Sequence, residues 1–196
     1  MLESRWLRGA FFAVPGLLLA GIGVVHPARL DAATAAWWAS LHVVLLLVFP
    51  LPAVAQWLLL TSAPRWLRWP GRLAAFGFAA FYGGLDAVAG IAAGTVVHAQ
   101  HGATPVVGAV FAAGDRLGHL GSACFLAANV LIVAAVVVRA GWWRAAPGAV
   151  LLLTASVSFL DSHIFWPRGV VTMIAVAVGM CLSGALLSRA SPPAAA

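Results

Sequence analysis

Six long apolar runs, separated by short polar stretches, dominate the sequence. A helix needs about 20 such residues to cross the apolar part of a bilayer. The runs therefore predict membrane-spanning helices at about 9–26, 37–60, 73–97, 113–138, 146–165 and 169–188. The run from Leu117 to Val138 is long enough to span by itself, so residues 105–113 are expected to form an interfacial or re-entrant piece. We expect an all-α bundle of six transmembrane helices, one domain over 1–190, with a short disordered tail at 191–196.

Polar side chains inside these runs recur with the period of a helix. Positions i, i+4 and i+7 lie on one helical face, and the four middle runs carry such faces: His42, Phe49 and Gln56; Tyr82 and Asp86; Asp115, His119, Ser122 and Asn129; Thr154, Ser158 and Asp161. Because an unsatisfied polar group in hydrocarbon costs several kcal/mol, we expect these faces to turn inward. The second to fifth helices should form a polar core, with the first and sixth nearer the lipid.

The composition agrees with insertion into a membrane. Hydrophobic residues make up 63% of the chain and charged residues 8%, against about 45–50% and about 25% in soluble domains. The net charge is +6, but the basic residues, all arginine, flank apolar runs. They therefore indicate topology and not a nucleic-acid surface.

The distribution of arginine predicts the orientation. One side of the predicted bundle would carry Arg5, Arg8, Arg65, Arg68, Arg72, Arg139, Arg144 and Arg189, and the other only Arg29 and Arg168, with Arg116 at the start of the fourth helix. Cytoplasmic loops are enriched in arginine and lysine. We expect a multi-pass protein of the cell membrane, with the lipid bilayer around it and both termini in the cytoplasm.

This orientation places all six histidines toward the outer side. His42 and His119 should lie at similar depth on alternate core helices, and His163 ends the fifth helix. Imidazole and carboxylate ligands suit Zn, Fe, Cu or Ni. The sequence predicts His42, His119 and His163 as metal ligands. Two facing imidazoles holding a haem b are a second choice, and a hydrogen-bonded network that only fixes helix register is the alternative to any metal.

Five other ionisable residues and one tyrosine are candidates for ligand binding or proton coupling: Asp86, Tyr82, Asp115, Arg116, Asp161 and Arg168. A carboxylate at membrane depth costs about 2.5–3.5 kcal/mol. Asp86, the deepest acid, should therefore be protonated, with Tyr82 or a backbone carbonyl as its partner. Asp161 should pair with Arg116 or Arg168, unless these two arginines hold a phosphate or carboxylate headgroup.

These residues define a function only in outline. The sequence contains no Gly-rich phosphate loop, no H-E-x-x-H and no C-x-x-C. We interpret the chain as a membrane-embedded binding protein, whose outward-facing pocket takes a metal ion or a small polar or lipid-like molecule. Two alternatives stay open: a membrane enzyme, either a single-haem redox protein or a metal-dependent lipid-modifying enzyme, and a structural subunit of a membrane complex.

Overall fold

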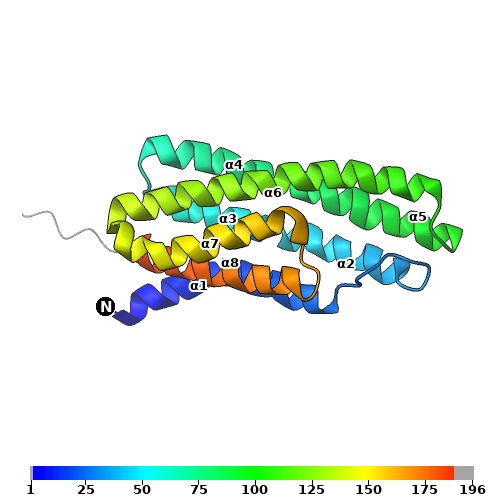
Figure 1. Cartoon of the computed structure of the whole chain (residues 1–196), viewed down its shortest axis with the longest axis horizontal. Helices are drawn as coiled ribbons and strands as arrows, with labels where there is room; N and C mark the ends of the chain where they lie inside the picture. The colour runs from blue at the N-terminus through cyan, green and yellow to red at the C-terminus, as the bar shows by residue number, and fades with distance from the viewer. Residues whose placement is uncertain (1, 188–196) are drawn as a thin grey trace, which may run out of the picture.

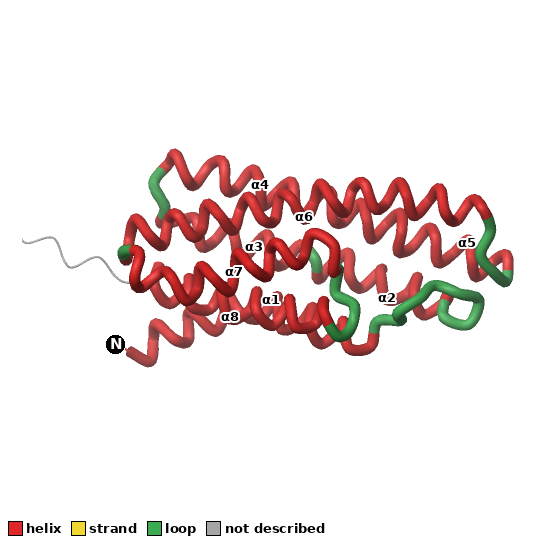
Figure 2. Tube along the Cα trace, viewed as in Figure 1, coloured by secondary structure: helices red, strands yellow, loops and turns green. Residues whose placement is uncertain are grey.

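The computed structural model describes residues 2–187, with side chains from residue 5, and the secondary structure of this part consists of helices joined by short loops (Figures 1 and 2). Six helical segments in it are long and apolar enough to cross a membrane, as predicted. They are α1 (Leu2–Val25); α2 (Ala35–Val48), α3 (Pro50–Leu59) and η1 (Leu60–Ser62); α4 (Arg65–Leu85), η2 (Asp86–Ala92) and α5 (Ala93–Gln100); α6 (Pro105–Ala140); α7 (Trp142–Ser162); and α8 (Arg168–Leu187). The predicted tail at 191–196 lies outside the described residues.

Two of the six segments are interrupted for local reasons. Pro50 begins α3; because proline has no N–H and its ring crowds the preceding turn, the helix is broken after α2. The third segment contains η2, a stretch of π-helix that begins at Asp86. Such stretches are rare and are frequent at functional sites.

The sixth helix was expected to lie nearer the lipid than the middle four, and this prediction was wrong, because it is the most buried of the six. Of the six segments, α8 has the largest buried share of its apolar window, 61%, because α1 packs along it on one side and α7 on the other. Small residues permit this close approach, as they do between membrane helices. A Cβ on Gly16 of α1 would stand 2.9 Å from Ala177 of α8, and one on Gly179 would stand 2.8 Å from Leu152 of α7.

The helices differ in length, and this creates a step in the bundle. The 36 residues of α6 extend about 54 Å, against about 30 Å for the 20 residues of α8. One end of α2, α5 and α6 therefore projects beyond α1, α7 and α8 (Figure 1). Residues 105–113 form the first turns of α6 and not a separate piece, because Pro105 at its first position is well suited to start a helix.

The step separates two apolar cores. The larger fills the main bundle, and a small one, formed by Ala35, Ala93, Val97 and Val107, holds the projecting helices together. In α2, the buried side chain of His42 lies between residues of the small core and residues of the large one. In the third segment, the buried side chain of Asp86 does the same. A polar layer therefore lies where the shorter helices end.

Deeper in the bundle, hydrogen bonds link three buried polar side chains. Gln56 Nε2 donates to Asn129 Oδ1 at 2.9 Å, and Asn129 Nδ2 donates to Ser156 Oγ at 2.8 Å. Ser156 in turn donates to the Leu152 carbonyl at 2.7 Å. The predicted polar face of α7 was wrong: Thr154 and Asp161 are exposed, and Ser156 turns inward instead.

Candidate metal centre and adjoining cavity

Three histidines from distant parts of the sequence meet where the shorter helices end. His26 directly follows α1, His42 lies in α2, and His163 directly follows α7. One ring nitrogen of each lies within 4.8 Å of one ring nitrogen of each of the others. The ring centroids are 5.1 Å apart for His26 and His42, and 5.6 Å apart for His26 and His163. The three imidazoles therefore form one cluster.

Each of the three rings is held through its Nδ1 atom. Nδ1 of His26 lies 2.8 Å from the Pro27 carbonyl oxygen, and Nδ1 of His42 lies 2.8 Å from the Trp38 carbonyl oxygen. Because a carbonyl oxygen only accepts, Nδ1 carries the proton in both rings and Nε2 keeps its lone pair. His26 Nε2 is buried and has no hydrogen-bond partner among the described residues. Histidines that bind metals are usually fixed in this way through the other ring nitrogen.

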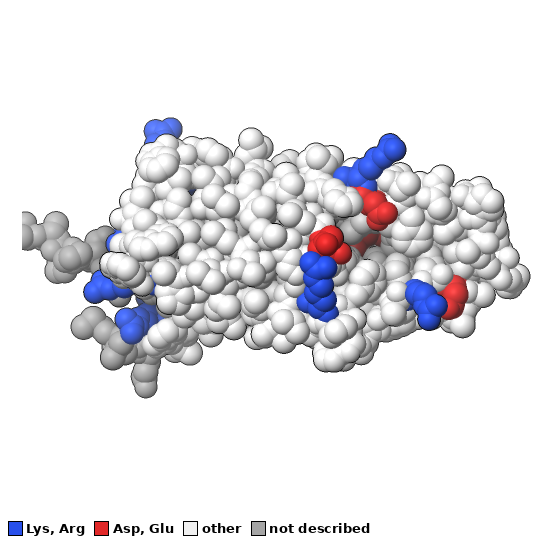
Figure 3. Space-filling model, in the orientation of Figure 1, with Lys and Arg blue, Asp and Glu red and all other residues white. Residues whose placement is uncertain are grey.

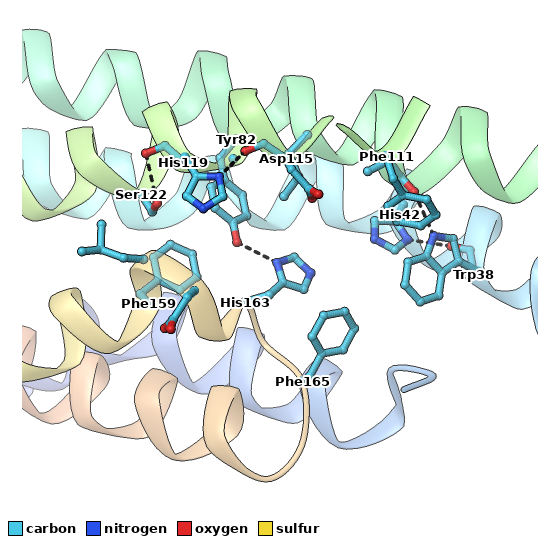
Figure 4. A pocket seen from close by; sticks show the side chains of 16 residues that line it. Trp38, His42, Tyr82, Phe111, Asp115, His119, Ser122, Phe159, His163 and Phe165 are labelled. Carbon is cyan, nitrogen blue, oxygen red and sulfur yellow. Dashed lines mark hydrogen bonds between the residues drawn. The ribbon is translucent and has the colours of Figure 1, made fainter. Parts of the chain in front are cut away.

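The third ring is positioned by a turn and by Tyr82. His163 has a φ of 45°, in the left-handed region that non-glycine residues rarely adopt and that costs about 1–3 kcal/mol. Its Nδ1 lies 2.6 Å from the Tyr82 hydroxyl, so Nδ1–H can donate a hydrogen bond to the hydroxyl oxygen and leave the Nε2 lone pair free (Figure 4). Strained residues of this kind cluster at functional sites.

Aromatic side chains cover the cluster. Phe165 and Trp38 lie edge-on to His26 at 4.7 and 4.9 Å, and Trp38 also stacks on His42 at 5.0 Å between centroids. Burial lowers the pKa of His26, against the smaller opposing effect of its bond to Pro27. The pKa of His163 is held well below its usual value, first by burial and then by the nearby His26 and His42. Both histidines are therefore neutral at neutral pH, which is the form that binds a metal.

A buried carboxyl group stands beside the cluster. Asp86 is fully buried, and its Oδ1 lies 4.0 Å from His42 Nε2. Neither carboxyl oxygen has a hydrogen-bond partner among the described residues. The expected bond from Tyr82 to Asp86 is not formed, because the Tyr82 hydroxyl lies against His163. Asp86 is also level with the ends of the shorter helices and not deep in the bundle, because its helix continues through α5 into the projecting part.

The π-helical stretch that begins at Asp86 brings α2 close. A Cβ on Gly90 would overlap the ring of His42, so this position accommodates the imidazole only as glycine. Trp38 Nε1 donates to the Ala89 carbonyl oxygen at 3.2 Å, which ties the two helices together. These contacts position His42 over η2, beside Asp86.

A cavity of about 290 Å³ adjoins the cluster between α6 and α7. Many of the residues predicted from sequence line it, namely His42, Tyr82, Asp115, His119, Asp161 and His163 (Figure 4). In Figure 3, acidic side chains surround a hollow on the side of the bundle. At its edge, Arg168 Nη2 lies 2.7 Å from Asp161 Oδ1, which is one of the two pairings expected. Arg116 is exposed and does not line the cavity.

The cluster differs in one member from the three ligands predicted. The structure brings His42 and His163 together, with His26 as the third residue. His119 is exposed on the cavity wall, where its Nδ1 lies 2.7 Å from the Asp115 carbonyl oxygen. Sequence reasoning missed His26 because it treated the residue only as the end of the first helix. The feature of the sequence that could have identified His26 was its position, because it ends a predicted helix at the same outer level as His163.

Comparisons with protein-family models, with curated proteins and with solved structures give no match for this chain. The interpretation of the site therefore rests on its own geometry and chemistry.

Proposed function

We propose that this chain is an integral membrane protein that binds one divalent transition-metal ion through His26, His42 and His163. The observation that carries the proposal is the approach of three ring nitrogens within 4.8 Å of one another. The Nδ1 atoms of the three rings are already engaged, which leaves their Nε2 atoms available. Three nitrogens bound at about 2.0–2.1 Å to one tetrahedral ion stand about 3.4 Å apart, so the rings need to shift somewhat toward one another to hold an ion.

Asp86 supplies the negative charge that such a site needs. An unpaired ion in an apolar interior is very costly, and the Asp86 carboxyl group, which is fully buried, lies beside His42. Metal binding would displace the Asp86 proton, as it does for other ligands that must be deprotonated. The carboxylate would then bind the ion directly or hold a water molecule bound to it. A set of imidazoles with one carboxylate suits Zn, Cu, Ni or Fe.

The unsatisfied groups distinguish this site from a purely structural network. The Gln56, Asn129 and Ser156 side chains are linked to one another by hydrogen bonds. Gln56 Oε1 also lacks a partner among the described residues, but three such atoms gather at the histidine cluster, namely His26 Nε2 and both Asp86 oxygens. Buried polar groups left in this state cost about 1–3 kcal/mol each. A bound ion satisfies the three at the cluster at once, which favours a ligand over a register-fixing role.

The packing of the rings favours a bare ion over haem. The His42 and His163 rings are parallel, with centroids 6.4 Å apart and an angle of 5° between planes. However, His26 stands edge-on to both of them at 5.1 and 5.6 Å, and Phe165 lies 4.9 Å from His163. A porphyrin between the two parallel rings would displace these neighbours.

We further propose that the site lies at the outer face of the cell membrane, with both termini in the cytoplasm. Arginine is concentrated at the other end of the bundle, and exposed tryptophans mark both ends: Trp142 and Trp143 at the start of α7, Trp166 just before α8. Cysteines introduced near Gly102 should react with an impermeant thiol reagent in intact cells, whereas cysteines near Ser62 should not. The reverse labelling pattern would overturn this orientation.

The metal proposal is tested by loading purified protein with Co²⁺ and measuring its content and visible absorption. We expect one ion per chain in the wild type and none in His26→Ala, His42→Ala or His163→Ala. His98→Ala and His101→Ala are matched controls, because both residues are exposed near the end of α5, and both should keep the ion. A wild type that takes up no Co²⁺, or three cluster variants that retain it, would refute the site.

A further inference from the structure

The cavity beside the proposed metal centre opens to the side of the bundle and not along its axis. Its exposed lining residues, Asp115, His119 and Asp161, belong to α6 and α7. Beyond the cluster, the end of the bundle is closed by the small apolar core that includes Val97 and Val107. A molecule that reaches the cavity therefore enters between α6 and α7 (Figures 3 and 4).

Two of the three histidines face this cavity. His42 and His163 line it, whereas His26 does not. Where Asp86 holds a metal-bound water and does not bind the ion itself, the three histidines leave one position of a tetrahedral ion exchangeable, as in zinc sites that bind water or substrate. Because the cavity touches the cluster on the side of His42 and His163, the open position would face the cavity. A donor atom from another molecule can then reach the ion.

The walls of the cavity favour a ligand in which the donor atom is attached to an apolar group. Leu85, Phe111, Phe159, Leu160 and Phe165 line it, and apolar atoms form most of its exposed wall although several polar side chains also reach it. Its volume, about 290 Å³, is at the lower limit of the range of about 300–1,000 Å³ seen for small-molecule sites. The space fits a polar head and a few carbons, and a longer chain would have to leave through the opening.

The opening lies at the level where lipid headgroups are expected. His119 precedes Arg139, at the opposite end of α6, by 20 residues, which is about 30 Å of helix and about the thickness of the hydrocarbon core. The Asp161–Arg168 ion pair at the edge is largely exposed, and such an exposed pair is stable in water or among headgroups and not in hydrocarbon. The opening is therefore accessible to molecules whose heads sit at the membrane surface.

We infer that this cavity binds the head and first carbons of a single-chain amphiphile with an oxygen-donor head, which enters sideways from the outer leaflet and coordinates the metal. The inference rests on the proposed metal centre. It adds to that proposal an open coordination position and the chemical class of the molecule that occupies it.

Two hydroxamates with the same chelating head test the inference on Co²⁺-loaded protein. Binding is followed as a shift of the Co²⁺ visible spectrum. Octanohydroxamate should bind at least about tenfold more tightly than acetohydroxamate, because its chain is buried against Leu160 and Phe159. Both are measured at one detergent concentration, so that partition into micelles cancels when variants are compared with the wild type.

A matched pair of variants on α7 tests where the octyl chain of the hydroxamate lies. Leu160→Trp fills the space that would take the octyl chain and should remove the preference for the octyl compound; acetohydroxamate binding and Co²⁺ content are measured on the same variant. Val157→Trp adds the same side chain at an exposed position outside the cavity and should keep the preference. If Leu160→Trp lowers Co²⁺ content, Leu160→Ala replaces it and should reduce the preference by removing wall contacts.

The outcomes separate this inference from the proposal beneath it. Equal binding of the two hydroxamates, or a preference that survives both Leu160 substitutions, would overturn the amphiphile site. If neither hydroxamate shifts the spectrum of Co²⁺-loaded protein, the ion has no coordination position open to an added ligand, and the inference also fails. A wild type without Co²⁺ would instead refute the metal centre itself.

Discussion

His42 Nε2 lies 4.0 Å from Asp86 Oδ1, and both side chains are buried. One comes from α2 and the other from the start of η2, so the contact joins two separate segments of the bundle. Without a metal, the acid has no hydrogen-bond partner among the described residues. With a metal between the histidines, the same position places a negative charge within reach of the ion.

Replacing Asp86 by asparagine should separate these two states. Asp86→Asn keeps the size of the side chain but removes the charge, so we expect Co²⁺ affinity to fall about 10–100-fold. The thermal stability of the metal-free protein should not fall, because the acid makes no hydrogen bond there. Metal titration and melting curves of the stripped protein measure the two effects. Unchanged affinity would show that Asp86 is not the charge partner of the ion.

Gly90 should be required for the metal centre although it carries no ligand atom. The Cβ introduced by Gly90→Ala would overlap the His42 ring, and relieving such an overlap typically costs about 1–3 kcal/mol. We expect a lower melting temperature and weaker Co²⁺ binding together. Gly83→Ala is the control, because a Cβ there meets nothing within 4 Å. Equal behaviour of the two variants would mean that His42 is not held against η2.

Lowered histidine pKa values give the site a defined pH dependence. The pKa values of His26 and His163 in the folded protein are lowered mainly by burial, whereas the unfolded chain titrates near the ordinary value of about 6.5. The free energy of unfolding of the metal-free protein should therefore keep the full contribution of these two histidines above about pH 6.5. It should fall as the pH drops below this value. Protons should also displace Co²⁺ only below about pH 6.5. Melting curves measure the stability and Co²⁺ absorption measures the bound metal across this pH range. Release of Co²⁺ at a higher pH would contradict the burial of the cluster.

The hydrogen-bonded network deeper in the bundle should affect stability and not metal binding. Asn129→Ala removes the bonds to Gln56 and Ser156 and leaves Gln56 Nε2 with only its long 3.4 Å bond to the Phe125 carbonyl, and loss of buried hydrogen bonds of this kind costs about 1–3 kcal/mol. Co²⁺ content at a temperature below the melting transition should equal that of the wild type. Loss of the ion in this variant, under conditions where it remains folded, would imply that the two polar layers depend on each other.

Different parts of the structure were predictable from the sequence for different reasons. Apolar runs gave the six spans because length and hydropathy are local properties. The burial of α8 depends on small residues such as Gly179 meeting another helix, which no local pattern reveals. The inward face of α7 was assigned to Ser158 and not to Ser156, because the sequence does not show which face of a helix meets its neighbours.

In the candidate site, too, some features follow from local sequence and others from tertiary packing. Spacing identified His42, Asp86 and Tyr82 as polar groups inside the bundle, and the outer position of His163 was also recognised. The place of His26 depends on how α1 ends next to α2 and α7, which is a tertiary relationship. The depth of Asp86 was misjudged because α5 and the start of α6 extend past the shorter helices, and the length of an apolar run does not tell where a membrane ends.

The central claim is that three imidazoles hold one metal ion, and X-ray absorption on zinc-loaded protein counts them directly. We predict three nitrogen ligands at about 2.0–2.1 Å, with the multiple-scattering signature of imidazole, and an oxygen ligand in the remaining position. In His26→Ala the zinc should be lost or its imidazole count should fall to two. A wild-type site with fewer than three imidazoles, or an unchanged count in His26→Ala, would contradict the account.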